Sequence, residues 1–71
     1  MRGCQSLAAS LRAGKSVSVA DLIGRAWIVP GGDGYLVRFE AKRGPGRMRR
    51  LGSAQAAVIW ALRLVRGQPV A

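Results

Sequence analysis

Half of the basic residues in this 71-residue chain lie in one stretch, residues 35–51, YLVRFEAKRGPGRMRRL, where Glu40 is the single acid. They are Arg38, Lys42, Arg43, Arg47, Arg49 and Arg50. An arginine side chain presents a planar fork of N–H donors that fits phosphate oxygens and the edge of guanine. The formal net charge of the chain is +9, and a GC-rich genome alone would spread its arginines more evenly. The stretch therefore predicts a nucleic-acid-binding site, with duplex DNA as the favoured partner.

Catalysis has little support in the residue types present. The chain has no histidine, one cysteine and three scattered acids, so the spacing provides neither an acid–base pair nor a set of metal ligands. Cys4 lies in a short helical pattern and is expected to be a small core residue. The glycine-rich segments PGGDG and GPG lack the lysine of a phosphate-binding loop and are expected to form hairpin turns. We therefore expect no enzyme activity, metal, cofactor or small-molecule substrate.

Hydrophobic periodicity predicts the strands that would position the basic residues. Tyr35, Val37 and Phe39 alternate with polar residues, which is typical of a strand with one apolar face. Further strands are expected at residues 25–29 and 47–51, on either side of the residue 35–41 strand. The expected sheet therefore has three antiparallel strands.

The basic residues are expected to share the other face of this sheet. Arg38 and Lys42 alternate with the apolar residues of the central strand. In the third strand, Met48 is expected on the apolar face, while Arg47 and Arg49 point away with Arg38. Leu51 breaks that alternation, which predicts a bend or bulge before the next element.

A helix is expected over residues 54–66, because Ser53 can cap its start and Gly67 can end it. Its apolar stripe is centred on Ala57 and Ala61, small residues that allow close packing across the apolar face of the sheet. The predicted fold class is α+β, with the helix on a three-stranded antiparallel sheet.

Two pairs of apolar residues need separate placement. Trp27 and Trp60 could stack on exposed bases, but both are expected in the core between sheet and helix. Ile59 and Leu62 fall outside the helix stripe and need another cover. That cover is expected to be the N-terminal helix or a second copy of the chain in a homodimer.

The N-terminal part of the chain is less regular. Residues 4–13 have helical spacing and are followed by Gly14, which can cap a helix. Residues 16–24 fit a strand or a helix, and the Ser18 and Asp21 spacing of a capping box favours a helical turn over residues 19–23. A helix-turn-helix with a following wing stays open.

The organisation expected is a single domain with an N-terminal helical segment (residues 1–24), a core of three strands and a helix (25–66) and a tail (67–71). The sequence has no run of about 20 apolar residues that could span a bilayer. We expect the protein to be cytoplasmic.

Over residues 25–66, an aromatic strand, a Tyr-x-Val-Arg-Phe strand, a Gly-Arg turn, a basic strand and a Ser-capped helix follow one another. The positions are Trp27, Tyr35, Val37, Arg38, Phe39, Gly46, Arg47, Arg49, Arg50, Ser53, Ala56 and Ala57. This order resembles the arm-type DNA-binding domain at the N-terminus of phage and transposon tyrosine recombinases. The resemblance implies that the exposed face of the sheet enters the DNA major groove through Arg38, Lys42, Arg47 and Arg49.

Two alternatives stay open. A helix, three strands and a helix at this length are also similar to double-stranded-RNA-binding domains, although basic residues here lie just upstream of the last helix and not at its start. The other alternative is a phage- or plasmid-encoded protein-binding module or inhibitor. It would present the basic face to an acidic protein partner and use the exposed Ile59 and Leu62.

Overall fold

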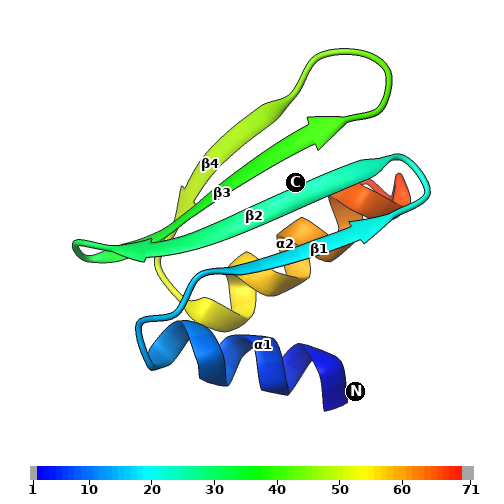
Figure 1. Cartoon of the computed structure of the whole chain (residues 1–71). Coiled ribbons are helices and arrows are strands. Elements are labelled where there is room, and N and C mark those ends of the chain that lie inside the picture. Colours follow the sequence, from blue (N-terminus) through cyan, green and yellow to red (C-terminus); the bar gives the residue numbers. More distant parts are fainter. Residues whose placement is uncertain (1, 70–71) are drawn as a thin grey trace.

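The computed structural model describes the backbone of residues 2–69 and the side chains of residues 6–69, so the expected core position of Cys4 lies outside the described side chains. Within residues 2–69 the chain forms two helices and four strands. In chain order they are α1 (Arg2–Arg12), β1 (Val17–Asp21), β2 (Gly24–Gly31), β3 (Gly34–Ala41), β4 (Arg47–Leu51) and α2 (Ala54–Arg66). The strands form one antiparallel sheet in the order β1-β2-β3-β4 (Figure 1). The α+β class is confirmed.

The first strand corrects the prediction of three strands. Residues 19–23, predicted to form a helical turn, belong instead to β1 and to the turn that follows it, so the helix-turn-helix alternative is not the fold. Val17 and Val19 pair with Ile28 and Ala26 of β2 and are half-buried on the side of the helices. The local capping signal was misleading because a few residues have only a weak intrinsic preference, and pairing with β2 decides their conformation.

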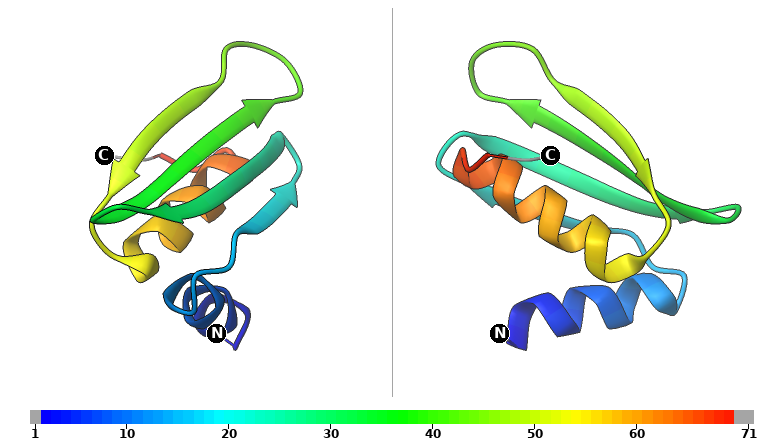
Figure 2. Two further views of the ribbon diagram at one scale, coloured as in Figure 1. Left: turned by 60° about the vertical axis from the view of Figure 1, so that its left-hand side comes forward. Right: turned by 180° about the vertical axis from the view of Figure 1, so that it is seen from behind.

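The core lies between one face of the sheet and α2. Ile28 and Val37, at the centre of β2 and β3, are fully buried against the helix side, as are Ala57 and Ala61 of α2. Figure 1 shows α2 behind the sheet, and the right-hand view of Figure 2 shows it in front. The predicted packing of the period-two apolar face on the alanine stripe is confirmed.

The ends of α2 are fixed by the residues that the sequence indicated. The Ser53 hydroxyl accepts a hydrogen bond from the Ala56 N–H at 3.1 Å. Gly67 takes a left-handed conformation with φ 75°, and its N–H donates to the Leu64 carbonyl. Glycine adopts this conformation without the steric cost that a Cβ would bring. The predicted bounds of this helix are confirmed.

The turn between β1 and β2 fastens the C-terminal end of α2 to the sheet. The Ile23 N–H donates to the Val65 carbonyl at 3.1 Å, and the Ile23 carbonyl accepts from the Lys42 N–H at 2.8 Å. The Arg66 side chain lies 3.6 Å from the carboxylate of Asp21. These contacts hold the end of β3, where the β3–β4 loop begins, in place.

The N-terminal helix covers part of α2. α1 packs along α2 and places Ala8 and Leu11 in the core (Figure 2). Leu62 is half-buried against that core, whereas Ile59 stays 39% exposed. Of the two residues that were expected to need a cover, only Ile59 is still exposed. Self-association through it stays a prediction. In the part of the chain that is described, no helix is long and apolar enough to cross a membrane.

Two valines on opposite faces of the sheet test this core. Val37→Asp should abolish cooperative unfolding, because an unpaired carboxylate at a fully buried site costs several kcal/mol in a domain whose stability is about 5 kcal/mol. Val29→Asp is the matched control, since Val29 is 46% exposed on the other face, and it should still fold. Circular dichroism during urea unfolding measures both, and a folded Val37→Asp protein would contradict the assigned core.

Candidate nucleic-acid interface

The pairing of β3 with β4 decides which way each arginine points. Arg49 lies opposite Val37 and Arg47 opposite Phe39, and both of these partners are buried on the α2 side. Residues paired across an antiparallel ladder share a face, so Arg47 and Arg49 lie on the α2 side. The prediction that they share a face with Arg38 is wrong.

The other residues of β4 follow the same alternation. Met48 pairs with Arg38 and lies on the uncovered face, 62% exposed, so its predicted place on the apolar face is also wrong. Leu51 pairs with Tyr35 in phase with Arg49, so no bulge forms, whereas a bend before α2, the other predicted possibility, is present at residues 52–53. The sequence misled because an apolar residue among arginines suggests an inward position, whereas this strand has little helix above it.

The position of α2 explains why arginines can occupy its side of the sheet. α2 packs mainly on β2 and β3 and touches β4 much less. Arg47, Met48, Arg49 and Arg50 are all exposed, and only Leu51 at the end of β4 is half-buried. A charged side chain on the α2 side of β4 therefore stays hydrated, so placing it there carries little desolvation penalty.

Arg49 has a defined place beside the helix. Its guanidinium carbon lies 5.8 Å from the centre of the Trp60 ring, within the range of a cation–π interaction. Trp60 is half-buried and packs against the core, as predicted. This arginine contributes to packing as well as to surface charge.

Arg50 and Arg38 both have partners within the protein. Arg50 reaches the turn between β2 and β3, where its Nη1 donates to the Gly31 carbonyl at 3.1 Å and lies 3.9 Å from the Asp33 carboxylate. Arg38 pairs with Glu40 on the same strand at 3.3 Å. The predicted group of six basic residues is therefore split in space.

We call Lys42, Arg43 and Arg47 the basic tip, because they lie in or next to the loop that joins β3 and β4. Figure 1 shows this loop rising above the rest of the molecule. Among the described residues, none provides an ion-pair partner for these three side chains. Gly46 permits the close return of the chain, since a Cβ there would lie 2.6 Å from the Phe39 carbonyl oxygen. The tip is an exposed and uncompensated cluster of positive charge.

The side of the sheet away from α2, which we call the open face, has no helix over it. Its side chains are those of Ser18, Ala20, Arg25, Trp27, Val29, Leu36, Arg38, Glu40, Met48 and Arg50, and none of them is buried. Trp27 was predicted to face the helix, which is wrong, because Ala26 and Ile28 take the two buried positions beside it. The alternation of Arg25, Trp27 and Val29 with these small and aliphatic residues was the signal that could have placed Trp27 and Arg25 on the open face.

No protein-family model, curated protein or solved structure matches this chain.

The contact between Arg49 and Trp60 can be tested against its neighbour. Arg49→Ala should lower the free energy of unfolding by about 0.5 to 1 kcal/mol, the usual size of an exposed cation–π interaction. Arg47→Ala is the control, since it removes the same charge two residues away on the same face, and it should change stability less. Urea unfolding measures both, and equal losses would contradict a specific contact with Trp60.

Proposed function

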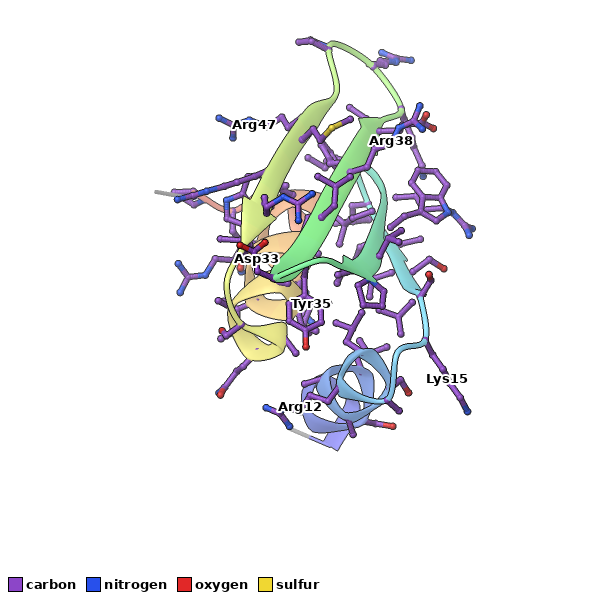
Figure 3. The ribbon with its side chains drawn as sticks, turned by 90° about the vertical axis from the view of Figure 1, so that its left-hand side faces the viewer. Arg12, Lys15, Asp33, Tyr35, Arg38 and Arg47 are labelled. Carbon is purple, nitrogen blue, oxygen red and sulfur yellow. The ribbon has the colours of Figure 1, made fainter. Side chains whose placement is uncertain are left out.

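We propose that the chain is a small DNA-binding protein whose β3–β4 hairpin enters a groove of duplex DNA. The observation that carries the proposal is the presence of arginines on both faces of the sheet at its β3–β4 edge, where β4 is the exposed edge strand. Arg38 lies on the open face and Arg47 and Arg49 on the α2 side, and Figure 3 shows Arg38 and Arg47 pointing to opposite sides. The basic tip adds further positive charge at the end of the hairpin, next to the arginines of both faces.

Groove entry accounts for this arrangement better than docking of one sheet face. A sheet that lies flat on DNA needs its cations on one side, as the resemblance to recombinase arm-type domains implied. A hairpin that enters a groove by its tip and its exposed β4 edge has a phosphate backbone along each of its two faces, so cations on both faces are neutralised at once. The major groove of B-DNA is wide enough for a two-stranded ribbon, and the arginines on both faces favour this mode.

The arginines on both faces of the hairpin also favour duplex DNA over the two alternative partners, double-stranded RNA and an acidic protein. The major groove of A-form RNA is too narrow and deep for side chains to read, so a ribbon favours duplex DNA over the double-stranded RNA of the second resemblance. An acidic protein partner would also be attracted to the basic tip. It stays the second candidate, because the unpaired charges of Lys42, Arg43 and Arg47 would serve either partner.

Salt dependence provides the test of phosphate contact. Each neutralised phosphate releases close to one counterion, so about four or five contacts should give a slope of about −4 in log affinity against log salt on duplex DNA. Arg43→Ala and Arg47→Ala should each reduce the size of this slope by about 0.9. Fluorescence anisotropy of a labelled duplex at several salt concentrations measures the slope.

The control is Arg12→Ala, which removes an equal charge from α1. Figure 3 shows Arg12 and Lys15 at the end of the molecule away from Arg38 and Arg47. We expect the control to keep the wild-type slope. Equal effects of all three substitutions would show non-specific attraction and count against the hairpin. A folded protein that binds neither DNA nor RNA at low salt would direct attention to an acidic protein partner.

A further inference from the structure

The open face contains a shallow hollow beside Trp27, an aromatic residue that the hairpin proposal does not use. It has a volume of about 440 Å³, and Trp27, Arg25, Lys42 and Glu40 line it together with the ends of β1 and β2. Arg25 and Trp27 are two residues apart on β2 and so project from the same face, about 7 Å apart along the strand. On the neighbouring edge strand, the small Ala20 lies opposite Arg25 and Ser18 opposite Trp27. These short side chains leave the hollow open beside the indole ring.

The charges that remain available in this hollow are positive. Its two carboxylates already have partners: Glu40 pairs with Arg38 at 3.3 Å, and Asp21 lies 3.6 Å from Arg66. Within the described part of the chain, no acid pairs with Arg25 or Lys42. The hollow therefore combines the half-buried ring of Trp27 with two cations that form no ion pair, although Glu40 lies opposite Arg25 in the pairing of β2 with β3.

An aromatic ring beside unpaired cations matches the chemistry of a nucleotide. A base can stack on an indole ring through its π face, and its phosphate can bind to a guanidinium or ammonium group. A base inside a duplex has both faces covered by its neighbours, so the ligand must be an unpaired nucleotide. An acidic peptide would satisfy the cations but would leave the ring of Trp27 without a stacking partner.

We propose that this hollow binds an unpaired nucleotide of single-stranded DNA, with the base stacked on Trp27 and the phosphate held by Arg25 and Lys42. The hollow and the basic tip share Lys42 at the end of β3, so the two sites are close enough to bind one DNA molecule at a junction of duplex and single strand. The choice of DNA over RNA rests on the proposed function. The stacking site itself is argued from the hollow and does not depend on the proposed function.

The test uses the full chain and a short fluorescein-labelled oligothymidylate, with binding followed by anisotropy. Trp27→Ala should weaken this binding roughly five- to a hundredfold, the loss expected for one stacked base, and Trp27→Phe should restore most of it. Arg25→Ala should reduce the salt slope on the single strand by about 0.7, as expected for one phosphate contact. In the wild type, quenching of tryptophan fluorescence on addition of unlabelled oligothymidylate should accompany binding.

The outcomes separate this site from the hairpin. Duplex binding should be unchanged by Trp27→Ala, and Arg43→Ala should weaken duplex binding more than single-strand binding. If duplex binding fails but the oligothymidylate still binds in a Trp27-dependent way, the groove proposal is wrong and this site stands. Equal single-strand affinity of a folded Trp27→Ala variant would overturn the stacking site. Tighter binding of oligouridylate would overturn the assignment to DNA, and tighter binding of a polyglutamate peptide, independent of Trp27, would replace the nucleotide by an acidic protein.

Discussion

The close approach of α2 to β2 and β3 is the constraint on which the rest of the structure depends. Ala57 and Ala61 let the helix backbone lie near Ile28 and Val37, and all four side chains are fully buried. A chain of this size has room for a single such core. The core fills the space over the middle of the sheet, which leaves β4 beyond the helix and the whole of the opposite face in solvent.

This limited cover separates the packing residues from the residues that carry charge. No charged or polar side chain is buried among those described, so the positive charge of the chain lies where water screens it. The exposed β4 edge is occupied by arginines, which also discourage pairing with another strand. The chain therefore has a strongly basic surface without a charged side chain entering the described core.

The small contacts at the ends of elements position the two candidate sites. The turn at Ile23 joins the last turn of α2 to the end of β3, so the start of the β3–β4 loop, where the basic tip begins, is attached to the helix that packs on the core. The same turn closes one end of the hollow beside Trp27. A site next to such anchored backbone needs little reordering when a ligand binds, which favours affinity.

The sequence by itself determined the elements whose signals are local. The bounds of α2 follow from Ser53 and Gly67, and the apolar face of β3 follows from the alternation around Val37, because caps and strict period-two patterns act within a few residues. Tertiary structure alone decided the strand at residues 17–21 and the faces of Arg47, Arg49, Met48 and Trp27. Those outcomes depend on which strand pairs with which, in what register, and on how far α2 reaches across the sheet, and a side chain's exposure is set by that cover rather than by its own polarity.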